Sequence, residues 1–461
     1  RSIGISIFFG DTRLDDSLGH KCSTVLIIID KGQARMSSIS STGSLGETET
    51  SPVMRNLATI LVFIIPISAC YAPAFNYASI GLLAASLLYF INYWRDIKIS
   101  GPAKFFIAAS FAFPLATLVN MWFFNNWQWL WLDNPSRLIL ILPAFVLMAN
   151  IRLNPVWLCL GILLSACIFG GTAIYQAHFL GISRANGWIT DLRSPITFGN
   201  AALLFSVLSL ATYPLIKSEI GFKLAGLTVI LAASLAAYAS LLSGTRGGWI
   251  SVPLLLISVL FADKKRSLLD KLLLLLLGLG LLLAVYIAID SVSTRIDHAW
   301  NELVRMVEYR EFTAGSVGAR LQMWWAAVLL FLDAPISGVG LGNYHAAKQI
   351  LIERGIVNSD IQRFGYAHSE VFHYLAEMGL VGILSLLVFY CSGFWLVIKG
   401  LQFNKPIAIM ALLVLMLRFD ISLTQVQFVY HYTTLLYAMM FAVLAGLMCN
   451  PHYQNNLDSK L

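Results

Sequence analysis

Long apolar segments recur along the chain from about residue 57 to residue 448, separated by short polar connections. An apolar stretch of about 18 residues or more predicts a membrane-spanning helix. The stretch LLLLLLGLGLLLAVYIAI at 272–289 is the clearest example. Transmembrane strands would instead give alternating segments of about ten residues. We therefore predict an all-α polytopic integral membrane protein.

The pattern predicts about twelve transmembrane helices, with edges uncertain by a few residues. They fall at 57–75, 78–95, 104–122, 137–151, 155–177, 196–216, 222–243, 247–262, 271–290, 369–398, 406–424 and 427–448. Lys and Arg gather in alternate connections, which places both termini in the cytoplasm by the positive-inside rule.

One connection, 291–368, is far longer than the others and falls on the extracytoplasmic side by the same rule. It contains the apolar run LQMWWAAVLLFLD, which at about 13 residues is too short to span comfortably. We expect this long periplasmic loop to carry helices that lie at the membrane interface.

The composition agrees with a membrane protein, because 58% of the residues are hydrophobic and only 12% are charged. An ordinary soluble domain has roughly a quarter charged residues, so a water-soluble enzyme is excluded. The net charge of +7 lies in short connections, and we predict no nucleic-acid partner. The six cysteines lack metal-ligand spacing, and we predict neither a metal nor a structural disulfide.

Residues 1–53 differ from the rest: they are mixed in charge and end in a stretch rich in Ser, Thr, Gly and Glu. This composition is typical of a flexible tail. We expect an N-terminal segment that is appended ahead of a natural start near Met54, or alternatively a native cytoplasmic tail. Residues 54–461 form the predicted transmembrane domain.

Charged residues near the membrane are costly, so those on the extracytoplasmic face are functional candidates. Arg246, in SGTRGGW, is flanked by glycines that allow close approach of an anion; the alternative is an anchor to lipid phosphates. Arg320 opens the interfacial helix, where its guanidinium and the helix N-terminus could both face a phosphate. Arg193 and Asn200, in LRSPITFGN, and the loop cation Arg295 are further candidates.

His368, in GYAHSEVFHYLAEMG, lies where the long loop re-enters the membrane. Imidazole titrates near neutral pH, so His368 is the best-placed candidate for proton transfer. Glu370, His373 and Glu377 follow at roughly helical spacing. The alternatives are a His–Glu metal cluster and a structural histidine. The zinc-protease motif is excluded because His368 and His373 are five residues apart.

Asp420, together with Arg418, interrupts the eleventh span. A buried carboxylate needs a partner, such as an Arg or the His368 region; a proton relay is the alternative. The glycine-rich APISGVGLGNY follows no strand, so it is not a dinucleotide-binding fingerprint. We expect it to let the long loop fold back.

The ordered series LRSPITFGN, SGTRGGW, the Arg-led loop with APISGVGLGNY, and AHSEVFHYLAEMG resembles the O-antigen ligase and polymerase superfamily. The resemblance covers most of the chain from about residue 57. Within that superfamily the chain is most similar to O-antigen ligases, because it has one dominant loop and a short C-terminal tail. Polymerases typically carry two comparable loops.

The resemblance implies an enzyme of lipopolysaccharide biosynthesis in the bacterial inner membrane, with its active site on the periplasmic face. Such a glycosyltransferase moves a polysaccharide from undecaprenyl-pyrophosphate to a sugar of the lipid A–core and uses no cofactor. The functional positions of the family map onto Arg246, Arg320 and His368, with Asp420 and Glu370 in support.

The chemistry of these residues agrees with this activity. Arginines stabilise a diphosphate leaving group without a metal, and His368 serves as base for the sugar hydroxyl. We expect a single displacement with inversion; a covalent intermediate would instead require Glu370, Glu377 or Asp420. The closest alternative is a polymerase, or a related oligosaccharyltransferase, with the same donor. A secondary transporter is a further alternative, although the chain shows no internal repeat.

Overall fold

The computed structural model describes residues 50–188, 194–245, 267–288, 290–309 and 316–453. The chain divides into two units, Arg1–Thr50 and Ser51–Leu461. The described residues of the second unit form helices and no strands, which confirms the all-α prediction for that part. The helices are α3 Pro52–Ser68, α4 Ala72–Tyr93, α5 Gly101–Ala109, α6 Ala112–Phe123, α7 Leu130–Leu140, α8 Leu142–Asn150, α9 Val156–Ile174, η1 Tyr175–Phe179, α10 Pro195–Ile220, α11 Phe222–Ser243, α13 Leu268–Ala288, α14 Asp290–Tyr309, α15 Ser316–Asp333, α16 Tyr344–Glu353, η3 Ser359–Ile361, α17 Glu370–Gly400, α18 Lys405–Thr424, η4 Gln427–Val429, α19 His431–Cys449 and η5 Pro451–Tyr453.

Nine helical segments of the described residues are long and apolar enough to cross a membrane, and each coincides with one of the twelve predicted spans. They are α4, α5 with α6, α7 with α8, α9 with η1, α10, α11, α17, α18 and α19. The predicted span 57–75 is the shorter helix α3, and 271–290 corresponds to α13. The predicted span 247–262 lies outside the described residues. The chain is therefore multi-pass by helix length and composition, and the count of twelve stays a prediction.

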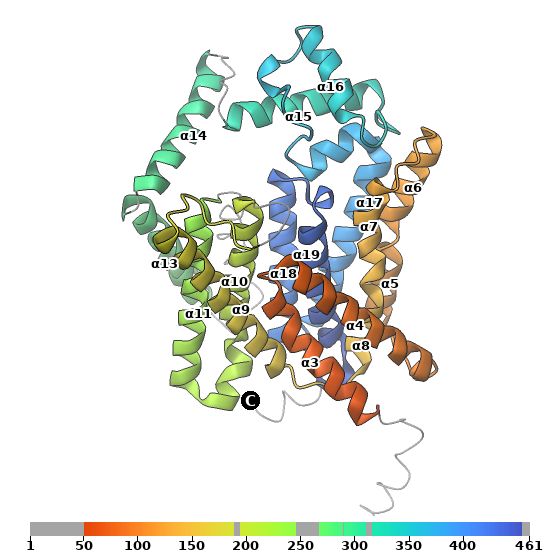
Figure 1. Cartoon of the computed structure of the whole chain (residues 1–461), viewed down its shortest axis with the longest axis vertical. Coiled ribbons are helices and arrows are strands. Elements are labelled where there is room, and N and C mark those ends of the chain that lie inside the picture. The colour runs from red at the N-terminus through yellow and green to blue at the C-terminus, as the bar shows by residue number, and fades with distance from the viewer. Residues whose placement is uncertain (1–49, 189–193, 246–266, 289, 310–315, 454–461) are drawn as a thin grey trace, which may run out of the picture. The chain divides into compact units, whose positions relative to one another are not determined.

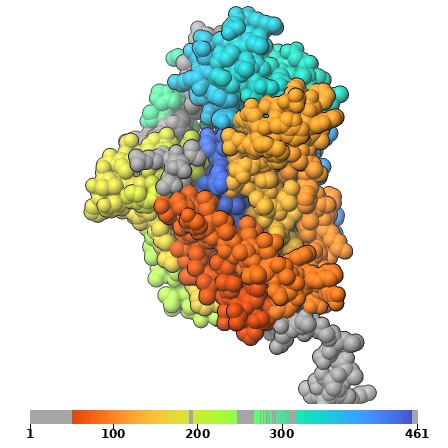
Figure 2. All heavy atoms as spheres, turned by 45° about the vertical axis from the view of Figure 1, so that its right-hand side comes forward, coloured from red at the N-terminus to blue at the C-terminus, as the bar shows by residue number. Residues whose placement is uncertain are grey.

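Helix α19 is the most enclosed of these segments, with 94% of its span buried. An apolar helix of a membrane protein can face either lipid or other helices, and α19 is surrounded by other helices. Helix α8 packs closely against α19 at Gly446, where a Cβ would lie 2.5 Å from the carbonyl oxygen of Phe145 on α8. Figure 2 shows only a strip of the blue last helices between the orange and yellow ones. Helices α9, α10 and α11 pack side by side as a second group (Figure 1).

Helix α17 is broken at Gly379, whose φ of +58° is outside the helical range. The glycine-rich segment after α15 docks at this break: Val339 N donates to Ala376 O, and Gly340 N donates to Glu377 O, both at 2.9 Å. A Cβ on Gly338 would lie 2.3 Å from the carbonyl carbon of Glu377. The glycines are thus required for close backbone packing of the loop on α17.

The remainder of the long loop has a small hydrophobic core of its own. Helices α15 and α16 and the turn at η3 enclose it together with the first part of α17. In Figure 1 these helices lie at one end of the helical bundle, beyond the start of α17. The expected helix in LQMWWAAVLLFLD is present as α15, which begins earlier than that run, at Ser316.

Candidate active site

His368 lies at the junction of the long loop with α17, which begins at Glu370. Its φ is +49°, in the left-handed region. This conformation costs a residue with a Cβ roughly 1–2 kcal/mol, so surrounding contacts must hold it. The ring of Phe364 packs edge-on against the imidazole with centroids 5.3 Å apart. Trp324 Nε1 donates to the carbonyl of the preceding Ala367 at 3.0 Å.

The charges around His368 are positive. Burial lowers the pKa of His368, and the charges of Arg320 on α15 and Lys348 on α16 lower it further. Burial also lowers the pKa of Arg320, and it lowers that of Lys348 to about 8. An imidazole with a lowered pKa is neutral at neutral pH, which is the form that accepts a proton.

Glu370, two residues after His368, is buried and bonded on both carboxylate oxygens. Its Oε1 accepts from the backbone N–H groups of Gln427 and Phe428 at 3.0 and 3.1 Å. The same oxygen lies 3.4 Å from the guanidinium of Arg418, and Tyr390 donates to Oε2 at 3.3 Å. Glu370 therefore ties the start of α17 to α18 and to η4.

Asp420 and Asn200 lie in the buried helices rather than on the loop, at 4% and 3% exposure. Both adjoin Tyr437, which interacts electrostatically with Asp420 and donates to the backbone carbonyl of Asn200 at 3.3 Å. Arg418, two residues before Asp420 in sequence, pairs with Glu370. The structure thus groups Asn200, Glu370 and Asp420 in one polar layer between α10, α17, α18 and α19.

His373 and Glu377 form a second buried pair on α17, with Nε2 and Oε2 3.5 Å apart. Glu377 Oε1 accepts from the backbone N–H of Tyr344 at 3.2 Å, and the ring of Tyr344 stands edge-on to His373. Among the described residues, no group of three or more His, Cys, Asp or Glu is placed to hold a metal ion. The pair fastens the start of α16 to α17.

The side chains of three predicted arginines are not among those that the structure describes. Arg193 and Arg246 lie outside the described residues, and Arg295 lies on α14 with only its backbone described. The described neighbours of the first two do meet: Thr245 Oγ1 donates to the carbonyl of Pro195 at 2.9 Å. LRSPITFGN and SGTRGGW are therefore in contact through Pro195 and Thr245.

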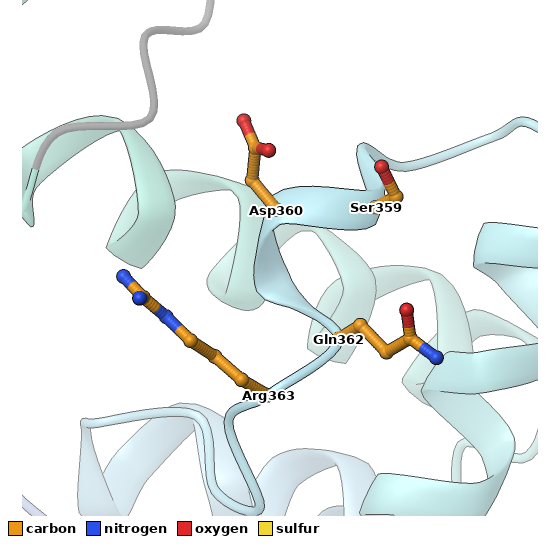
Figure 3. Close-up of a pocket in the computed structure, with 4 residues that line it drawn as sticks. All are labelled: Ser359, Asp360, Gln362 and Arg363. Atoms are coloured by element: carbon orange, nitrogen blue, oxygen red, sulfur yellow. The ribbon is translucent and has the colours of Figure 1, made fainter.

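A surface hollow of about 480 Å³ lies on the turn before His368. Its described lining is polar: Ser359, Asp360, Gln362 and Arg363 (Figure 3). The side chains of Gln362 and Arg363 leave the turn in opposite directions. This hollow offers hydrogen-bonding side chains on the turn that precedes His368 in sequence.

Sequence reasoning missed Lys348, which is fully buried beside this turn. The available signal was helical spacing: Tyr344, Lys348 and Leu351 share one face of α16 and all are buried. It also missed a polar cluster in which Arg137 lies 2.9 Å from Asp133 and 3.1 Å from the imidazole of His431. No sequence motif marks that cluster.

Residues 231–387 match the model of a protein family described as O-Antigen ligase. The match includes the positions of Arg246, Arg320, His368 and Glu370, and it shows similarity to that family over this part of the chain. Asn200 and Asp420 lie outside the matched residues.

The chain is also similar to an uncharacterized protein of Haemophilus influenzae. The two are 28% identical over 363 residues, which is 77% of this chain and 86% of the relative. The similarity thus extends beyond the residues that match the family.

Proposed function

We propose that this protein is an O-antigen ligase that transfers a polysaccharide from undecaprenyl-pyrophosphate to a sugar of the lipid A–core. The observation that carries the proposal is His368, whose backbone is left-handed and whose half-buried imidazole feels the positive charges of Arg320 and Lys348, within the residues that match the family. Its partners in the reaction are two lipid-linked glycans, and the surrounding lipids complete the site. The reaction needs no nucleic acid.

His368 acts as the general base. A sugar hydroxyl is a poor nucleophile until its proton is removed as it attacks. The neutral imidazole takes this proton while the hydroxyl oxygen bonds to the anomeric carbon of the donor. Burial and the nearby charges of Arg320 and Lys348, which lower the pKa of His368, keep the imidazole neutral at physiological pH.

Arginines stabilise the leaving diphosphate. As the glycosidic bond breaks, negative charge develops on the undecaprenyl-pyrophosphate, and Arg320 and Arg246 bind it by paired hydrogen bonds. Arg193, Arg295 and Asn200 complete the donor site. The contact between Thr245 and Pro195 supports a shared site for Arg246 and Arg193, since it joins the segments next to them.

The displacement occurs in one step, with inversion at the anomeric carbon. The hydrogen bonding of Glu370 supports this mechanism, because both its oxygens are already bonded to protein groups. Asp420 supports the site from the buried layer. A glycosyl group trapped covalently on a carboxylate would contradict the single displacement.

The enzyme acts in the bacterial inner membrane as a multi-pass protein. Its active site lies on the periplasmic face and its termini lie in the cytoplasm. The loop 291–368, with α14, α15 and α16, covers the site from the periplasm.

The acceptor that receives the glycan distinguishes a ligase from a polymerase and so tests the proposed function. Purified protein in detergent receives an undecaprenyl-pyrophosphate glycan, with and without lipid A–core. A ligase forms product on lipid A–core and none in its absence. Longer carrier-linked chains without that acceptor would indicate a polymerase. If neither product forms, substrate flux in sealed vesicles would test the transporter alternative.

A further inference from the structure

Lys348 is a buried cation to which the proposed reaction assigns no contact with donor or acceptor. Its relative exposure is 0%, although it lies outside the candidate membrane spans. In the described part of the chain its ammonium meets no carboxylate; it donates to the carbonyl of Ile361 at 2.8 Å and to that of Phe364. It also lies 5.7 Å from the ring centroid of Tyr344. Burying an ammonium without a counter-charge is costly, so packing alone does not explain it.

The two carbonyls belong to one turn. Phe364 N donates to Ile361 O at 3.1 Å, which closes the turn, and Lys348 holds both ends of it. The ring of Phe364 then packs edge-on against His368. A continuous set of contacts therefore runs from the Lys348 ammonium to the imidazole.

We propose that Lys348 is a positioning residue for His368: its ammonium fixes the turn at 361–364, through which Phe364 holds the imidazole. The proposal that this arrangement serves catalysis rests on the proposed function. The contacts between Lys348, the turn and His368 do not depend on that function.

Other charged and titratable groups also influence the protonation of His368. Arg320 from α15 adds a second positive charge, and His373 from α17 interacts with His368 electrostatically. The pKa of Lys348 is lowered to about 8, so its ammonium stays charged over the pH range in which His368 titrates. Removing that charge should make protonation of His368 easier.

The test measures the protonation of His368 without substrate. Diethyl pyrocarbonate modifies neutral imidazole, so mass spectrometry of the His368 peptide across pH gives a labelling midpoint. We expect Lys348→Met and Lys348→Gln to move this midpoint to higher pH, and Lys348→Arg to leave it near that of the wild type. Arg354→Gln, which removes an exposed cation at the end of α16, is the matched control and should not move it.

Hydrogen exchange of the same proteins tests the positioning. We expect Lys348→Met to speed amide exchange in residues 359–368. Lys348→Gln replaces that variant if it does not fold. An unchanged midpoint and unchanged exchange in folded Lys348→Gln would overturn the proposal. Neither measurement uses a glycan donor, so a failed transfer assay would overturn the proposed function and leave this result standing.

Discussion

The Glu370 carboxylate and the Arg418 guanidinium lie 3.4 Å apart and are both buried, and Glu370 follows His368 by two residues. Breaking a buried pair leaves one charge unpaired, which costs about 3–5 kcal/mol. The pair joins α17 to α18, so its loss should loosen the junction that carries His368.

Arg418→Met should therefore lower the unfolding temperature in detergent more than the double variant Glu370→Gln with Arg418→Met does. Glu370→Gln alone keeps the acceptor for Gln427 and Phe428, and we expect it to retain part of the transfer activity. Complete loss of transfer in a folded Glu370→Gln protein would instead give the carboxylate a chemical role.

His368→Gly separates backbone strain from catalysis. Glycine adopts positive φ freely, so this variant should be as stable as the wild type or more so, by about 1 kcal/mol. It should nevertheless lose transfer, because it has no imidazole. Thermal unfolding and transfer measured on the same preparation check both parts; an active glycine variant would show that His368 has only a structural role.

The pH dependence of transfer follows from the cations beside His368. The pKa of His368 lies below its ordinary value of 6.5, because burial and the charges of Arg320 and Lys348 disfavour the imidazolium. The rate should stay flat near neutral pH and fall as the pH drops through this lowered pKa.

Arg320→Met should lower the rate and also move this acid limb to higher pH. Arg305→Met, which removes an exposed charge on α14, should leave the limb in place. Profiles of kcat/KM against pH for the wild type, Arg320→Met and Arg305→Met compare the positions of the acid limb. An acid limb that does not respond to Arg320→Met would remove that arginine from the surroundings of the base.

Docking of the long loop on α17 depends on Gly338. Its φ is +64°, and a Cβ there would overlap the backbone of Glu377, so Gly338→Ala should destabilise the fold by about 1–3 kcal/mol. Gly365, in the same loop, has open space around it, and Gly365→Ala should change stability by less than about 0.5 kcal/mol. Unfolding temperatures and limited proteolysis of the loop measure both. Equal stability of the two variants would contradict the docking described here.

Much of the fold follows from hydrophobic pattern. A lipid-facing or fully buried helix such as α19 needs an unbroken apolar run, and such runs are visible in the sequence. The break in α17 at Gly379 was not predicted, since it depends on the carbonyls of Pro335 and Ile336, which lie more than 40 residues earlier. Predicted edges also differ where prolines start helices, as at α3 and α4.

The candidate site was predicted by residue type more than by arrangement. His368 was chosen as a candidate because a histidine at a loop–helix junction is distinctive, whereas its left-handed backbone is set by tertiary contacts. The partner of Arg418 could not be chosen from sequence, since Asp420 is nearer along the chain than Glu370. Lys348 was missed because a lysine in a polar loop is ordinarily solvent-exposed.

The most direct test of the account is transfer to lipid A–core by the wild type and by His368→Asn, both in EDTA. Asparagine tolerates the left-handed conformation and fills similar space, so this variant removes the base and little else. We predict full activity of the wild type in EDTA and a loss of about 10²–10⁴-fold in His368→Asn. Activity that disappears in EDTA, or that persists in His368→Asn, would contradict a metal-independent transfer with His368 as base.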